Sequence, residues 1–174
     1  MTDQHTNSDK LETADRGAGR TMRLHVHSGQ DGTVHTIADA PTDSLVADHV
    51  DFPAGAHVFA VDDTGRELNA TDRLVDAFSE GTGRVVTHPG RQITVAVHYA
   101  GAAATLTVSP GVRLAVIREQ AISQLGIDPA SAADLGLRLP SGTEDLPLDK
   151  PIASIAKGAD RVDLELVALV RPQG

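Results

Sequence analysis

The sequence predicts an α+β protein made of two small tandem domains, each a mixed β-sheet packed on one helix. Short runs of alternating apolar and polar residues are typical of half-buried strands. The order hairpin, helix, strand, glycine turn, short helical turn, strand occurs twice, with a period of about 70 residues. Hydrophobic residues make up 40% of the chain and aromatic residues only 2%. The cores are therefore built from Val, Leu, Ile and Ala, as expected for small, thin domains.

Composition divides the chain into five segments. Residues 1–21 are polar and rich in Asp and Thr, which predicts a disordered N-terminal tail. Residues 22–88 are predicted to form the first domain, the more degenerate of the two. Residues 89–92 are a linker, because Pro and Gly together stop a continuing element. Residues 93–170 are predicted to form the second domain, and residues 171–174 a flexible C-terminal tail.

In the first domain, Met22, Leu24 and Val26 alternate with polar residues and predict a strand. A glycine turn then closes a hairpin with residues 33–37. A weak apolar stripe predicts a short helix over residues 42–50. The remaining predicted elements are a strand over 56–61, a short helical turn over 71–78 and a strand over 84–87.

The second domain repeats this order with a clearer helix. Ser109 is predicted to cap that helix, with Pro110 at its first position and Gly126 at its end. Apolar residues at helical spacing follow: Leu114, Ile117, Ala121, Ile122 and Leu125. The predicted strands and turns around the helix are a hairpin over 93–108, a strand over 135–139, a short helical turn over 151–155 and a strand over 162–168.

Charge and residue content exclude several function classes. The net charge of −9 and the lack of a basic cluster argue against nucleic-acid and anionic-membrane binding. The chain has no cysteine, so disulfides, thiolate catalysis and Cys-ligated zinc are excluded. No apolar run approaches the roughly 18 residues of a membrane span, and no signal peptide is visible. We expect a cytoplasmic protein that is not an enzyme and binds no cofactor or metal.

The order of elements resembles that of ubiquitin-like proteins with the β-grasp fold. Three runs in the second domain carry the resemblance: TLTVSPGVRLAVIREQAISQLGI over Thr105–Ile127, LGLRLPSG over Leu135–Gly142, and VDLELVALVRPQG over Val162–Gly174. They are similar to the second strand and helix, the third strand and its turn, and the last strand and tail of ubiquitin. With its degenerate first copy, the chain resembles the tandem modifiers of bacterial conjugation operons, including those of antiphage defence.

This resemblance implies a protein modifier with a reactive C-terminus at Gly174. The expected partners are an E1-like activating enzyme, an E2-like conjugating enzyme, a JAB-type isopeptidase and a target protein. Glycine suits a tail that threads a narrow channel, because it lacks a Cβ. Arg171 is expected to meet an acidic groove on the activating enzyme. Pro172 stiffens the tail, and Gln173 completes the segment that the enzyme recognises.

Two departures from the family pattern affect these expectations. The tail ends in one glycine, whereas ubiquitin-like modifiers usually end in two. Arg138 stands where ubiquitin has an apolar partner-binding residue on its third strand, so the usual ubiquitin readers are not expected to bind this face. Lys150 and Lys157 are candidate acceptors for chain formation, although an ordinary surface position explains them better.

Other polar groups have simpler explanations. His25 and His27 share the spacing of a metal-binding pair, but they alternate with core residues and are expected to form a solvated face with His35 nearby. Asp62 and Asp63, followed by Glu67, lack the spacing of a calcium loop and fit an ordinary turn.

Two other functions remain open for this fold. One is a non-conjugated tandem β-grasp adaptor that binds partners through sheet faces or strand edges, for which Gly174 is dispensable. The other is a sulfur carrier with a terminal thiocarboxylate. Such carriers normally have one domain and end in two glycines.

Overall fold

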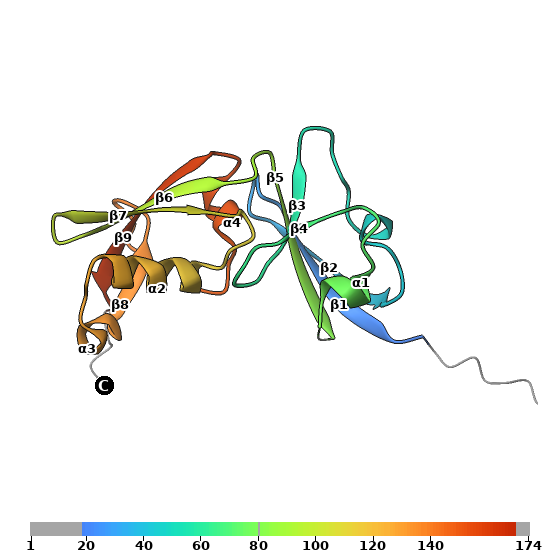
Figure 1. The fold of residues 1–174 in the computed structure, drawn as a ribbon, viewed down its shortest axis with the longest axis horizontal. Helices are drawn as coiled ribbons and strands as arrows, with labels where there is room; N and C mark the ends of the chain where they lie inside the picture. Colours follow the sequence, from blue (N-terminus) through green and yellow to red (C-terminus); the bar gives the residue numbers. More distant parts are fainter. Residues whose placement is uncertain (1–18, 80, 170–174) are drawn as a thin grey trace, which may run out of the picture.

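The computed structural model describes residues 19–79 and 81–169. It has two separate β-sheets, one in each half of the chain (Figure 1). Strands of the first sheet lie between residues 21 and 88, and strands of the second between residues 93 and 168. This arrangement confirms the predicted α+β class with two tandem domains.

The first sheet places its first and last strands at the centre. The strand order is β2-β1-β5-β3-β4, with β1 antiparallel to β2 and parallel to β5. The strands are β1 Thr21–His27, β2 Val34–Pro41, β3 His57–Ala60, β4 Glu67–Leu68 and β5 Thr82–His88. Buried side chains on one face form the first core: Met22, Leu24, Ala40, Val46, Val50, Val58, Ala60, Leu68, Leu74 and Val85.

The helix predicted over residues 42–50 is reduced to a single 3-10 turn, η1 (Val46–Asp48). Only Val46 and Val50 are buried in this segment, so burial gives little reason for a longer helix. Its first amides instead bond to a neighbouring loop, with Val46 N–H donating to the Asp72 carbonyl at 2.8 Å. The one α-helix described in this half is α1, a single turn over Leu74–Ala77.

The second sheet repeats the central parallel pair with four strands. Their order is β7-β6-β9-β8, and β6 is parallel to β9. The strands are β6 Ile93–Tyr99, β7 Ala102–Val108, β8 Leu135–Arg138 and β9 Arg161–Ala168. The helices are α2 Leu114–Gln124, α3 Pro129–Ala132 and α4 Ile152–Ala156. Helix α2 covers the inner face of the sheet through Leu114, Ile117 and Ala121.

Helix α2 ends as predicted but begins later. Gly126 has φ +64°, a conformation that favours glycine. Around it, Ile127 N–H donates to the Ile122 carbonyl at 3.1 Å, and Gly126 N–H donates to the Ser123 carbonyl. The helix begins at Leu114 with Arg113 as N-cap. The prediction that Ser109 caps the helix is therefore wrong.

An apolar interface joins the two domains. Phe59, Val61 and Val86 come from the first domain, yet they belong to the buried cluster of the second. Strands β3 and β5 thus use both faces, one for their own core and one for the neighbouring domain. Helix α4 contacts β5 across this interface. Because these three side chains are almost fully buried, separating the domains exposes apolar surface to water.

Polar contacts fix the register of this interface. Ser109 Oγ donates to the Gly65 carbonyl of the first domain. Ser109 therefore connects the two domains instead of capping α2. Arg113 N–H donates to the Asp62 carbonyl at 3.2 Å. His88 is 1% exposed: its Nδ1 accepts from Gly90 N–H at 3.0 Å and its Nε2 lies 3.1 Å from the Ala159 carbonyl. A proton on Nε2 satisfies both contacts.

Candidate functional site

The base of the predicted tail lies at one corner of the second sheet. Ala168 pairs with Leu135 at the end of β9, and Leu169 N–H donates to the Asp134 carbonyl at 2.7 Å. A Cβ on Gly136 would lie 2.6 Å from Cδ2 of Leu169, so glycine at position 136 makes room for this side chain. The chain is thus ordered and anchored through Leu169. Figure 1 places this corner at the end of the second domain opposite the first.

The predicted tail residues lie outside the described part of the chain. These are Arg171, Pro172, Gln173 and Gly174. Their roles in recognition and conjugation stay predictions. The last residue that the structure describes before them is Leu169.

The outer face of the second sheet is polar near the position of ubiquitin's apolar contact. Arg138 Nε donates to Asp145 Oδ1 at 2.7 Å, which holds the guanidinium against the sheet. On the neighbouring strands, Asp163 Oδ1 lies 3.3 Å from His98 Nε2 and 3.4 Å from an Arg161 nitrogen. The hydrogen bonds from His98 and Arg161 hold the pKa of Asp163 below its usual range. A partner for this face needs polar groups rather than an apolar contact.

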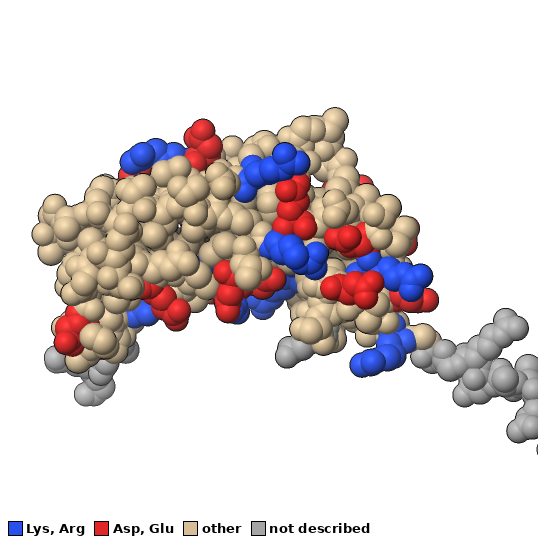
Figure 2. Space-filling model, in the orientation of Figure 1, with Lys and Arg blue, Asp and Glu red and all other residues tan. Residues whose placement is uncertain are grey.

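Figure 2 shows how charged side chains are distributed over one face of the two domains. Acidic and basic residues lie side by side around the junction of the two domains, whereas the visible face of the second domain carries few charges. Pairs across the junction include Arg84 with Asp149 at 3.3 Å and Arg113 with Asp63. The linker residue Arg91 also bonds to Glu67 Oε2 at 3.1 Å.

The two candidate acceptor lysines differ in exposure. Lys157 is exposed and follows α4 with φ +50°, whereas Lys150 is half-buried. Neither forms an ion pair with another described residue. Of the two, Lys157 presents the more accessible amine.

The histidines and turn carboxylates gather no metal ligands within the described residues. Asp62 Oδ1 accepts from the amides of Thr64 and Gly65 at 2.7 and 2.6 Å, as in an ordinary Asx turn. The expectation of a solvated histidine face is wrong for His27, which is 8% exposed. The physical reason is that His27 lies on the face that meets the second domain. Val86, its partner on β5, belongs to that domain's buried cluster, and local periodicity does not reveal this contact.

Burial of His27 makes stability depend on pH. Desolvation, then the charge of Arg84, lowers the pKa of His27 to about 4 from 6.5. Between these values the unfolded chain binds more protons than the folded one, so stability falls as the pH falls through this window. From about pH 7 to about pH 4.5, we expect the wild type to lose about 2 kcal/mol more than His27→Gln. Urea unfolding at both pH values measures this difference, and equal losses would contradict it.

The groove between α2 and α3 is a surface that the sequence reasoning missed. It has a volume of about 640 Å³ and is lined by residues of α2, of α3 and of the loop between them, among them Ile122, Ile127 and Pro129. The available signal was a pair of isoleucines at and just after the end of the helix. The helical stripe had assigned Ile122 to the core, and Ile127 follows the glycine that ends the helix; both are half-buried.

The chain is similar to one known protein family and to solved structures of ubiquitin-like proteins. Residues 94–169 match the family described as BilA ubiquitin-like domain 2. Caldiarchaeum subterraneum ubiquitin is 13% identical with a TM-score of 0.36, and the alignment covers 47% of this chain and 99% of that one. The N-terminal ubiquitin-like domain of the 4931431F19Rik protein is 15% identical with a TM-score of 0.37, over 49% and 82%.

None of the curated proteins compared with the chain matches it. Within residues 19–79 and 81–169, no helix has the length and apolar character that crossing a membrane requires. The family match covers the sheet and helices of the second domain, and the first domain repeats the same central parallel pair. The chain is therefore a ubiquitin-like protein with two tandem β-grasp domains.

Proposed function

We propose that this chain is a bacterial protein modifier that an E1-like enzyme activates at Gly174 and an E2-like enzyme joins to target proteins. Antiphage defence is the proposed setting, and a JAB-type isopeptidase removes the modifier. One observation carries the proposal: the chain is anchored through Leu169 at the end of the second domain that the first domain leaves uncovered.

The proposed chemistry uses the chain as substrate. A terminal carboxylate oxygen of Gly174 attacks the α-phosphate of ATP and pyrophosphate leaves. A cysteine thiolate of the activating enzyme then displaces AMP, forming a thioester that passes to the conjugating enzyme. A lysine amine of the target displaces the thiol and loses a proton, which leaves an isopeptide bond. This chain supplies the carboxylate, a tail residue without a Cβ and a docking surface.

Deletion of Gly174 tests this proposal. With a cognate activating enzyme and ATP, we expect the full chain to form a thioester and the deleted chain to form none, because Gln173 then ends the tail. Intact-mass analysis measures both species. A Lys150→Arg variant serves as a control, since the activation step does not use it. Undiminished thioester from the deleted chain would end the modifier proposal.

A non-conjugated adaptor is the second candidate function. The polar outer face around Arg138 and Asp163 favours it, because the charged groups of that face can bind a partner without the tail. In an adaptor, deletion of Gly174 leaves partner binding unchanged, so the same variant separates the two functions.

A further inference from the structure

The groove between α2 and α3 has an apolar floor and an acidic rim. Ile122, Ile127 and Pro129 line it together with Ala132. Ile122 and Ile127 are only half-buried and pack on the core from their other side. The floor is therefore fixed in place by the fold and still accessible to a visiting side chain.

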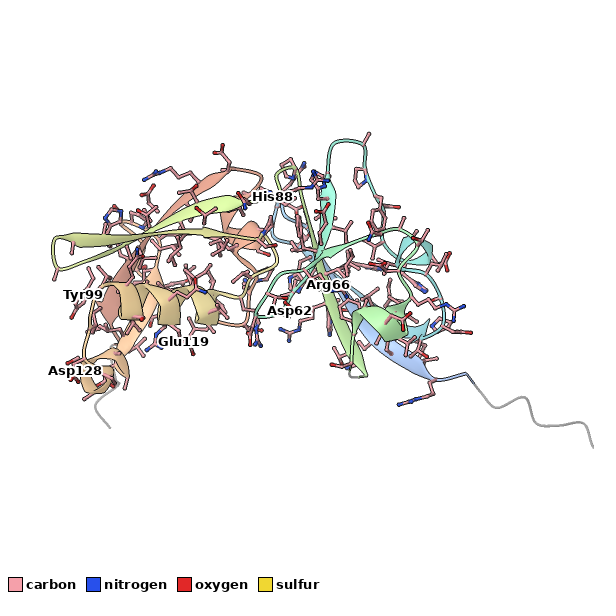
Figure 3. All side chains as sticks on the ribbon, in the orientation of Figure 1. Asp62, Arg66, His88, Tyr99, Glu119 and Asp128 are labelled. Atoms are coloured by element: carbon pink, nitrogen blue, oxygen red, sulfur yellow. The ribbon has the colours of Figure 1, made fainter. Side chains whose placement is uncertain are left out.

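The charges around this floor favour a cation. The Glu119 side chain is exposed, and its carboxylate forms no ion pair with another residue in the described part of the chain. Asp128 uses Oδ1 to accept from Ala130 N–H at 2.8 Å, which leaves its second oxygen at the rim. The end of the eleven-residue helix α2 points into the same region and adds partial negative charge. Figure 3 shows Glu119 and Asp128 on the same side of the second domain.

The one basic residue of the lining is already engaged. Arg118 Nε donates to the Leu135 carbonyl at 2.7 Å, and a second guanidinium nitrogen donates to the Ala132 carbonyl. These bonds tie α2 to α3 and to the start of β8, so the guanidinium shapes the wall of the groove.

We propose that this groove binds a segment of a partner protein that carries a branched aliphatic side chain next to a Lys or Arg. The aliphatic side chain packs on Ile122 and Ile127, and the cation faces Glu119 and Asp128. The groove adjoins the anchor of the tail, because Ala133 lines it and the next residue, Asp134, accepts from Leu169 N–H. A protein that handles the tail therefore reaches the groove at the same time. Binding in the groove does not require Gly174 to be activated.

Titration of the full chain with two blocked peptides tests the proposal. The probes are acetyl-Ala-Leu-Lys-Ile-Arg-Ala-amide and the same peptide with Glu in place of Lys and Arg. In ¹⁵N NMR spectra we expect the basic peptide to shift the amides of Ser123, Gly126 and Ile127, and to bind several-fold more tightly than the acidic one. Glu119→Lys is expected to weaken the basic peptide about fivefold, as reversal of an exposed ion pair does.

Two further variants sharpen the result. Asp39→Lys, a charge reversal on β2 of the first domain, is the matched control and should bind both peptides as the wild type does. Ile127→Ser should weaken both peptides, because it removes part of the floor. Equal binding of the two peptides, or shifts outside the groove, would overturn the proposal. If a chain lacking residues 170–174 binds about tenfold more tightly, the groove belongs to the chain's own tail, and the partner proposal also fails.

Discussion

Replacing Phe59 with alanine is expected to destabilise the second domain, although Phe59 lies in the first. Its ring is 2% exposed and belongs to the buried cluster of the second domain. Loss of a buried phenylalanine with its cavity costs about 3 to 5 kcal/mol. For a chain of this size, that loss lowers the midpoint of thermal unfolding by about 10 °C.

The chain carries its own reporter for this effect. Tyr99 is the single tyrosine, and the chain has no tryptophan, so tyrosine fluorescence reports the second domain alone. Far-UV circular dichroism reports both domains. We expect Phe59→Ala to shift the two signals equally. Val75→Ala, at a half-exposed position of α1, is the control and should change neither by more than a few degrees. An unchanged Tyr99 transition would show that the domains unfold independently.

The sequence predicted the second domain better than the first, for a physical reason. Alternation along β6 and β9 and the helical stripe of α2 each coincide with burial in one core, so local pattern and tertiary structure agree. In the segment 42–50, only two residues are buried and the amides bond to a loop. Helical periodicity there is too weak to define the structure.

Contacts between the domains were the part that local patterns could not predict. Ser109 has the type and position of a helix cap, yet its hydroxyl bonds to Gly65 about forty residues earlier. His27 alternates with core residues and was expected in solvent, yet it is buried beside Val86 on the face that meets the neighbouring domain. In both cases the residue satisfies a local rule, and the deciding partner comes from a distant segment. The tail lies outside the described residues, so its predicted role awaits the Gly174 deletion.

Substitution of Gly111 with alanine is expected to separate the domains. A Cβ at this position would overlap the Ala60 carbonyl oxygen and lie 3.0 Å from Gly65 Cα and from Phe59 Cβ. None of these atoms belongs to a flexible side-chain end, so the segment around Gly111 must move away from the first sheet. That movement breaks the hydrogen bonds of Ser109 and Arg113 to the first domain. Overpacking and the lost bonds together cost about 3 kcal/mol.

Gly81→Ala is the matched control for Gly111→Ala. The control position has nothing within 4 Å of a built Cβ and has no positive φ, so the same methyl group finds open space. We expect Gly81→Ala to unfold within about 0.5 kcal/mol of the wild type and in one transition. For Gly111→Ala we expect two transitions, with the Tyr99 signal separated from the rest. A single transition at the wild-type midpoint would mean that the interface accommodates the added methyl group without loss of stability. The tandem arrangement would then not depend on this contact. Two transitions would show that the close approach of Gly111 and Gly65 holds the first domain at the end of the second opposite the tail anchor.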